Sequence, residues 1–332
     1  MKKSKSFFSC LCAGVLVLGI LTGCSEKGTV GIGNRLETGE VQENSVVIHV
    51  GDTSVRYREV RNYCYLLKEQ YESSFGKKIW NYELDDGSTI GDEAKEEIIN
   101  MITQLKVISA TAESEKVTLT NDEKDEALQK AEKLMENVID KDKKNYHLSI
   151  QSLEKIYEEN ALANKMFYIS TDAADTEVTN EEARQARIAY ILIKEAGGNK
   201  AGEASGKGNV AKRATALLKQ AKKVNDFSEF ARENTEADSV ELTIGKESTE
   251  LDEEAVTAAF SLEEGEISPV IAGRSGYYII YCINPMDEDA TYARKEEIIE
   301  ERQTNMFKKK YTEWLGEYEV DISKAFWKVF EI

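Results

Sequence analysis

Proline, histidine and cysteine are scarce in this sequence: its 332 residues include two prolines, two histidines and five cysteines. Proline interrupts helices, so its near absence beside 31% charged residues favours a largely helical chain. The few, scattered cysteines argue against a disulfide scaffold or a zinc cluster, and neither a catalytic Cys/His pair nor a Gly-x-Ser-x-Gly motif is present. We therefore expect neither a metal ion nor a cofactor.

Basic residues are also in deficit. Lys and Arg total 43 against 61 Asp and Glu, which gives a net charge of −18. So acidic a chain repels the phosphates of nucleic acids, and no basic, aromatic-rich stretch offsets the repulsion. These counts argue against nucleic acid as a partner. The length of the chain separately suits one large domain or two to three modest ones.

The N-terminal segment has the features of a secretory signal. Three lysines within the first five residues precede the apolar run 7–21, which is too short for a comfortable membrane span. The run ends in Leu-Thr-Gly-Cys, which resembles the bacterial lipobox. The resemblance implies cleavage of residues 1–23 and a diacylglycerol on the sulfur of Cys24. We expect a lipid-anchored protein on the extracytoplasmic face of the cell membrane; an ordinary signal with a chance cysteine is the alternative.

The start of the mature chain is expected to be a tether. Residues 24–44 are rich in Gly and Glu without periodicity, which is typical of a flexible segment that lifts a folded body off the membrane. Cys64 and Cys282 then remain, each among apolar residues. Buried free thiols are favoured over a bridge between them.

Residues 45–171 have the pattern of a helical region that follows a short strand pair. Residues 46–56 predict two short strands about a Gly-Asp turn, and residues 76–92 are expected to be a polar loop. The segment Thr120–Glu123 has the polar cap and early acids of a helix start. Residues 287–332 return to a helical pattern and end in an apolar tail that we expect to be ordered.

The pattern changes over residues 183–286. The segments 186–194 and 276–283 are strand-like, with helical patterns between them, and residues 197–208 hold five glycines that indicate a flexible loop. We therefore expect an α+β module inserted into a helical domain, with the two helical flanks packed together.

Three segments of this module match the parvulin-type peptidyl-prolyl isomerase domain in the right order: Asp226–Ala231, Ala258–Ser268 and Gly276–Ile280. With the lipobox and the helical flanks, the whole chain resembles the PrsA/SurA class of extracytoplasmic foldases. The resemblance implies a mostly helical, SurA-N-like chaperone domain made by both flanks and an inserted FKBP-like parvulin domain. It also implies unfolded or partly folded secreted proteins as partners, and it leaves a homodimer open.

Tyrosines occupy the two histidine positions of the parvulin site. These positions are Tyr190 and Tyr278, and the only two histidines of the chain lie outside the module. Asp238 lies beside the family's acidic or Cys position, and Ser275 matches its hydroxyl position. The resemblance assigns all four to the catalytic site, and core packing of both tyrosines is an equal alternative.

The family's proline pocket is altered as well. Leu251 and Ala255 take the positions of its Met and Phe, and Phe260 is the third candidate for substrate binding. Helix packing is the alternative role for Leu251 and Phe260. Glu241–Gly245 replaces a Gly-Gly-Asp-Leu-Gly stretch of the family, and the acidic run Glu250–Glu254 is expected to be a solvated face.

Rotation about an X-Pro bond faces a barrier of about 18–20 kcal/mol, and a catalyst can lower it by holding proline in an apolar slot. Tyrosine is larger than histidine, and an Ala where the family has Phe opens that slot. We therefore expect a foldase whose helical flanks offer an apolar groove to unfolded chains and whose isomerase activity is weak or absent. The alternatives are an active isomerase in which tyrosines replace the histidines, and a non-catalytic envelope lipoprotein that binds a solute or scaffolds a complex.

Overall fold

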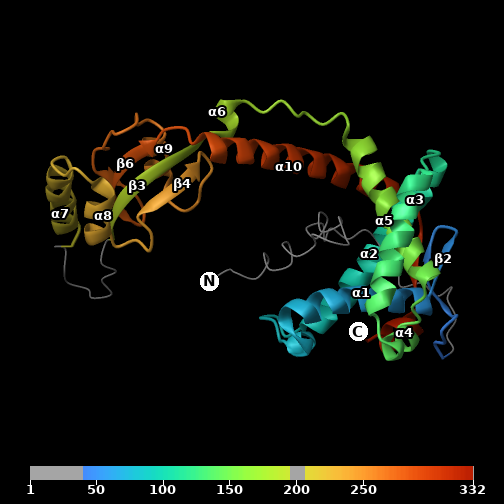
Figure 1. Ribbon diagram of the computed structural model, residues 1–332. Helices are drawn as coiled ribbons and strands as arrows, with labels where there is room; N and C mark the ends of the chain where they lie inside the picture. Colours follow the sequence, from blue (N-terminus) through green and yellow to red (C-terminus); the bar gives the residue numbers. More distant parts are fainter. Residues whose placement is uncertain (1–39, 195–205, 332) are drawn as a thin grey trace. The chain divides into compact units, whose positions relative to one another are not determined.

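The computed structural model describes residues 40–194 and 206–331 (Figure 1). The described residues form two units: a helical unit of residues 40–173 and 303–331, and an inserted unit of residues 174–302. The predicted signal, Cys24, most of the tether and most of the glycine-rich loop lie outside the described residues. Within the described part, no helix is both long and apolar enough to cross a bilayer.

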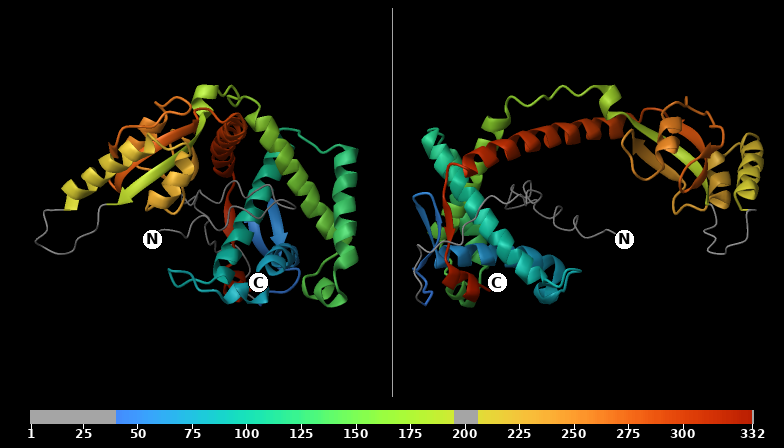
Figure 2. Two further views of the ribbon diagram at one scale, coloured as in Figure 1. Left: turned by 60° about the vertical axis from the view of Figure 1, so that its left-hand side comes forward. Right: turned by 180° about the vertical axis from the view of Figure 1, so that it is seen from behind.

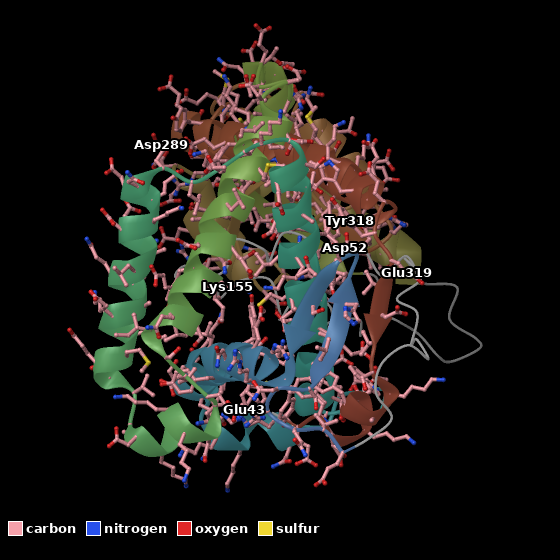
Figure 3. The ribbon with its side chains drawn as sticks, turned by 90° about the vertical axis from the view of Figure 1, so that its right-hand side faces the viewer. Glu43, Asp52, Lys155, Asp289, Tyr318 and Glu319 are labelled. Atoms are coloured by element: carbon pink, nitrogen blue, oxygen red, sulfur yellow. The ribbon has the colours of Figure 1, made fainter. Side chains whose placement is uncertain are left out.

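A three-stranded antiparallel sheet joins the two flanks within the helical unit. Its order is β2-β1-β7, and its strands are β1 (Val46–Val50), β2 (Thr53–Arg56) and β7 (Val320–Ile322). The predicted strand pair is therefore confirmed, with Gly51 at φ +55° in the turn. A Cβ at Gly51 would lie 2.9 Å from the ring of Tyr318, which Figure 3 shows beside this turn. Because β7 pairs with β1, the predicted packing of the two flanks is also confirmed.

Helices make up most of the helical unit. They are α1 (Tyr57–Phe75), η2 (Lys77–Asn81), α2 (Ile90–Ser114), α3 (Asn121–Asn137), α4 (Asp140–Asn145), α5 (Ile150–Thr171) and α11 (Lys324–Val329). The prediction of a loop over 76–92 was wrong in part, because the short helix η2 lies inside it and the capping box of Thr89 and Asp92 starts α2 before its end. Helices α2 and α3 both lie against α5 (Figure 2).

Helix α2 is the centre of the helical unit. Eight consecutive residues, 101–108, are buried, so the helix is covered all round rather than on one face. Lys106 lies within this run, and its Nζ contacts Glu59 Oε1 of α1 at 2.5 Å and both carboxylate oxygens of Glu159 of α5 at 2.6 and 2.8 Å. Tyr63 donates to Glu159 at 3.2 Å. This buried ionic cluster ties three helices together.

A four-stranded antiparallel sheet forms the inserted unit. Its order is β4-β3-β6-β5, and its strands are β3 (Gln185–Lys194), β4 (Glu241–Gly245), β5 (Ile271–Ala272) and β6 (Gly276–Asn284). The helices of this unit are α6 (Asn180–Ala183), α7 (Gly206–Ala221), α8 (Phe227–Asn234) and α9 (Glu253–Ala259). Helices α7 and α8 cover one face of the sheet and α9 covers the other (Figure 1). The strand β4 occupies the stretch Glu241–Gly245, where the sequence showed only a departure from the family pattern.

The inserted unit extends beyond the predicted 183–286 at both ends. Helix α10 (Glu288–Leu315) belongs to it up to Arg302. Arg302 donates to the backbone oxygens of Asp175 and Glu177 at 3.1 and 3.3 Å and to Glu182 Oε1 at 2.6 Å. These bonds hold the incoming segment from residue 174 against the middle of α10. A boundary set by side-chain contacts of this kind has no local sequence signal.

Candidate functional site

Tyr190 and Tyr278 lie together on the face of the sheet that α9 covers. In the β3–β6 ladder Tyr190 is opposite Ile280 and Leu192 is opposite Tyr278, so the two tyrosines are diagonal neighbours. Their ring centroids are 6.4 Å apart, with the ring planes inclined by 31°. Both side chains are buried in one apolar cluster. The structure therefore brings together the two residues that the resemblance placed at the histidine positions.

The Tyr278 hydroxyl donates to a buried carboxylate, that of Asp252, at 3.1 Å. The same carboxylate accepts hydrogen bonds from the backbone N–H of Ser275 at 2.7 Å and from its hydroxyl at 3.0 Å. Gly273 lies so close that a Cβ there would be 2.4 Å from Asp252 Oδ2. The loop between β5 and β6 therefore closes directly over Asp252.

Burial and hydrogen bonding act in opposite directions on Asp252. Burial raises the pKa of this carboxyl, but the hydrogen bonds from Ser275 and Tyr278, with the charge of Arg274, lower it by more, so the pKa lies below its usual value. Burial, with the neighbouring Asp252 charge, raises the pKa of Tyr278. The pair is therefore an ionised carboxylate and a neutral phenol at neutral pH.

Asp252 was not predicted as a site residue. The acidic run Glu250–Glu254 was predicted to be a solvated face, and this is wrong for Asp252, which is 8% exposed and sits at the N-cap position of α9. The available signal was an aspartate, which has a short acidic side chain, directly after the apolar Leu251. It is followed by two glutamates in the first turn of the helix. That signal predicts a helix start, but not burial.

The remaining candidates divide into two groups. Leu251 and Ala255 are buried in the same cluster as the tyrosines, and Phe260 packs against it with the Arg184 guanidinium 5.2 Å from its ring centroid. Asp238, in contrast, is exposed, and no hydrogen bond within the described residues joins it to Tyr190, Tyr278 or Ser275. The structure thus assembles every predicted site residue that it describes except Asp238.

Most of this assembly is closed to solvent. Its two phenols, its carboxylate, Leu251 and Ala255 are buried, and Ser275 is exposed. In the described part of the chain, the Tyr190 hydroxyl has no hydrogen-bond partner, so the two tyrosines do not form a mutual network. Among the described residues, no group of three or more His, Cys, Asp or Glu side chains is arranged to hold a metal ion.

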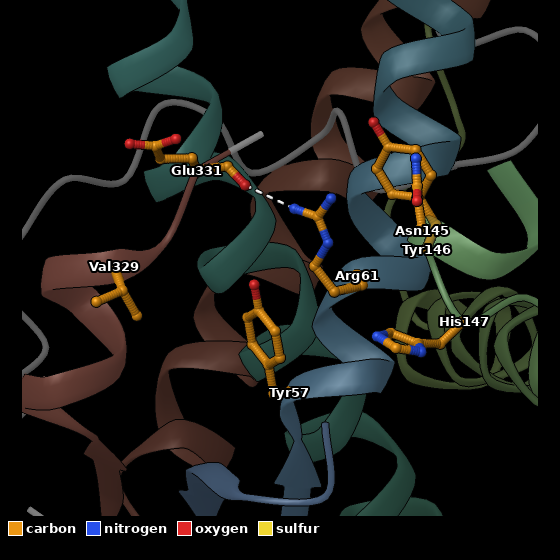
Figure 4. Close-up of a pocket in the computed structure, with 7 residues that line it drawn as sticks. All are labelled: Tyr57, Arg61, Asn145, Tyr146, His147, Val329 and Glu331. Atoms are coloured by element: carbon orange, nitrogen blue, oxygen red, sulfur yellow. Dashed lines mark hydrogen bonds between the residues drawn. The ribbon is translucent and has the colours of Figure 1, made fainter. Parts of the chain in front are cut away.

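The helical unit contains a separate pocket of about 440 Å³ (Figure 4). Its lining consists of Tyr57, Arg61, Asn145, Tyr146, His147, Val329 and Glu331. Arg61 donates to the backbone oxygen of Glu331 at 2.7 Å, and its guanidinium lies 4.6 Å from the Tyr146 ring centroid. Most of the lining side chains are polar, so this pocket differs from the apolar groove that the sequence predicts.

Aromatic side chains gather at the C-terminal end of α1. The Tyr71 ring centroid is 6.2 Å from that of Phe75 and 5.5 Å from that of Trp80. Phe75 is 43% exposed, and Tyr82, two residues after Trp80, is 63% exposed. We call these four residues the aromatic patch. A contiguous exposed apolar patch is typical of surfaces that bind other chains, whereas single exposed aromatic residues are normal.

Comparison with known proteins finds two family models. The SurA-like N-terminal domain matches residues 1–167, and the PPIC-type PPIase domain matches residues 191–284. Foldase protein PrsA from Caldanaerobacter subterraneus subsp. tengcongensis is 24% identical over 299 residues, which cover 82% of this chain and 86% of that protein.

Similar solved structures include two proteins that are also named PrsA. Foldase protein PrsA from Streptococcus pneumoniae is 17% identical with a TM-score of 0.34, over 84% of this chain and 96% of that one. Peptidylprolyl isomerase (PrsA) from Bacillus cereus is 16% identical with a TM-score of 0.35, over 86% and 99%.

Proposed function

The chain belongs to the family with a SurA-like N-terminal domain, and from this we propose that it is a PrsA-like foldase that assists the folding of secreted proteins. One observation carries the proposal. The PPIC-type module is inserted between two flanks that fold into a single helical unit through the β1–β7 pairing. A client-binding body with a proline-directed module is the arrangement that this function requires.

We propose that clients bind the helical unit at the aromatic patch. Phe75 and Tyr82 expose apolar surface to solvent, and burying it against an unfolded segment is favourable by about 25 cal/mol per Å². The strong negative charge of the chain suits clients with cationic stretches and keeps the body soluble. Both properties favour transient binding of unfolded chains.

The inserted unit is proposed to be a second binding surface with weak or absent isomerase activity. Tyr190 and Tyr278 stand where the family has histidines, and the phenol of Tyr278 is already engaged by Asp252. Leu251 and Ala255 are buried against the sheet. A slot for the proline ring would have to form beside these packed side chains, which supports a reduced rate.

The anchor remains part of the proposal. We propose that Cys24 carries a diacylglycerol and holds the protein on the extracytoplasmic face of the cell membrane, on the basis of the Leu-Thr-Gly-Cys motif. Cys24→Ser should move the protein from the membrane to the soluble fraction of cells. Retention of the Cys24→Ser protein in the membrane would contradict the anchor.

Suppression of client aggregation tests the foldase. Residues 25–332 should reduce light scattering from a refolding client, and Phe75→Ser with Tyr82→Ser should weaken this effect several-fold. Tyr292→Ser is the matched control, because Tyr292 of α10 is equally exposed at 64% but lies in the inserted unit. A protein that leaves scattering unchanged would favour the alternative, a lipoprotein that binds a solute or scaffolds a complex.

A further inference from the structure

The pocket of the helical unit is lined by an arginine that contacts only neutral groups. The Arg61 guanidinium donates to the backbone oxygen of Glu331 at 2.7 Å and lies 4.6 Å from the centroid of the Tyr146 ring. The thiol of Cys64, another neighbour of Arg61, is uncharged because burial raises its pKa to about 12. Within the described residues, no carboxylate oxygen lies within 4.0 Å of the Arg61 nitrogens. This lack of an acidic partner is notable in a chain with 18 more acids than bases.

The charge of Arg61 can be reached from the pocket. Arg61 is half-buried, and the pocket of about 440 Å³ opens beside it. Tyr57 lies one turn earlier on the same face of α1, and its hydroxyl points in the same direction as the Arg61 guanidinium (Figure 4). Among the described residues the Tyr57 hydroxyl has no hydrogen-bond partner. The carboxylate of Glu331 points away from Arg61 (Figure 4), so the cation and the phenol face the pocket together.

The opposite wall of the pocket is fixed by a buried amide. Asn62 is 1% exposed, and its Nδ2 donates to the backbone oxygens of Tyr146 and His147 at 2.7 and 3.2 Å. These bonds hold residues 145–147 against α1 and place the exposed side chain of Asn145 at the pocket. Val329, which is 56% exposed, adds an apolar group to the lining. The pocket is therefore built by the fold, and its volume lies in the range of about 300–1,000 Å³ that small-ligand sites have.

The chemistry of this lining suits a single carboxylate. The planar N–H fork of arginine matches the two oxygens of a carboxylate, and the phenol of Tyr57 can donate a third hydrogen bond. One guanidinium balances one negative charge. Two acids close to the pocket disfavour a dianion such as phosphate: Glu331, and Glu43, whose Oε1 is 3.5 Å from His147 Nδ1.

We propose that this pocket binds the side-chain carboxylate of an aspartate or glutamate in an unfolded client, with a neighbouring apolar residue against Val329. The inference rests on the proposed function, since it takes the ligand to be part of a client. The net negative charge of the chain repels acidic segments. The pocket thus gives an acidic foldase a place to hold segments that the rest of its charge disfavours.

Binding of two labelled peptides to residues 25–332, followed by fluorescence anisotropy, tests this proposal. The peptides are apolar and differ only in one central residue, which is Glu or Gln. The Glu peptide should bind about fivefold more tightly, although the net charge of the protein opposes it, and an excess of inorganic phosphate should leave it bound. Equal affinity, weaker binding of the Glu peptide or displacement by phosphate would overturn the carboxylate site. The foldase is judged separately by client aggregation, so its failure and that of the pocket are distinguishable.

Three variants assign the preference to the pocket. Arg61→Gln should bring the two peptides to equal affinity, whereas Arg58→Gln removes the same charge from an exposed position of α1 outside the pocket lining and should keep the fivefold difference. Tyr57→Phe keeps the ring that packs against Phe326 at 6.0 Å and should reduce the difference about twofold. A preference that survives Arg61→Gln would overturn the site. Should Arg61→Gln fail to fold, an unchanged preference in Tyr57→Phe would overturn it instead.

Discussion

Lys106 of the central helix α2 is the residue whose replacement most directly tests how the helical unit is held together. Its side chain is 2% exposed, and its ammonium pairs with the carboxylates of both Glu59 and Glu159, which are 18% and 12% exposed. Burial lowers the pKa of Lys106, but the two carboxylates raise it by more, so the group is charged at neutral pH. Lys106→Met fills similar volume and leaves the two carboxylates without their buried counter-ion.

The expected loss in the free energy of unfolding for Lys106→Met follows from these contacts. Removing one partner of a buried ion pair costs about 3–5 kcal/mol. Lys155 offers partial compensation, because its Nζ is 3.8 Å from both carboxylates, although its side chain is 57% exposed. We therefore expect Lys106→Met to lower the free energy of unfolding by about 3 kcal/mol, at the low end of that range. Lys155→Met should cost less than about 1 kcal/mol.

Urea unfolding followed by tryptophan fluorescence measures this loss in the helical unit alone. All three tryptophans, Trp80, Trp314 and Trp327, belong to that unit. Adding Glu59→Gln and Glu159→Gln to Lys106→Met should recover much of the stability, because the unpaired charges are then gone. A loss below about 1 kcal/mol for Lys106→Met, or an equal loss for Lys155→Met, would refute the ionic cluster as a source of stability.

Two further predictions concern local structure. Thr120→Ala should lower the stability of the helical unit by about 1 kcal/mol in the same fluorescence assay, because Thr120 Oγ1 accepts from the N–H of Glu123 at the start of α3; an unchanged midpoint would contradict the cap. In the inserted unit, the ionised Asp252 carboxylate stabilises the fold above about pH 4, because its pKa is lower in the folded protein than its ordinary value. This stabilisation is lost as the pH falls through the folded-state pKa. Asp252→Asn should therefore flatten the acid side of the unit's stability profile, measured by near-UV circular dichroism of its tyrosines; an identical profile would count against an ionised Asp252.

Local chemistry explains what could be predicted from the sequence. The cap at Thr120 depends on a hydroxyl and a glutamate three residues apart, and the structure has both reciprocal bonds there. The β1–β2 hairpin likewise depends on Gly51 and on its alternating neighbours. The position of Tyr190 and Tyr278 on one face follows from the period of two in adjacent strands.

Long-range contacts explain what could not be predicted. Lys106 resembles any lysine in a helix until Glu59 and Glu159, 47 and 53 residues away, meet it. Asp252 differs from the exposed acids beside it only because the loop at Gly273 and Ser275 covers it, more than 20 residues further on. Neither burial has a signature within its own segment, and the acidic run that contains Asp252 was predicted as a solvated face for that reason.

Catalysed cis/trans isomerisation of a proline peptide by residues 25–332 is the measurement that tests the account most directly. The wild-type protein and the Tyr190→Phe and Tyr278→Phe variants should all give the uncatalysed rate, while each continues to suppress client aggregation. That result is expected of a parvulin-like unit that serves binding. A wild-type rate well above background that falls in either variant would show that the tyrosines act in catalysis, and it would contradict the account.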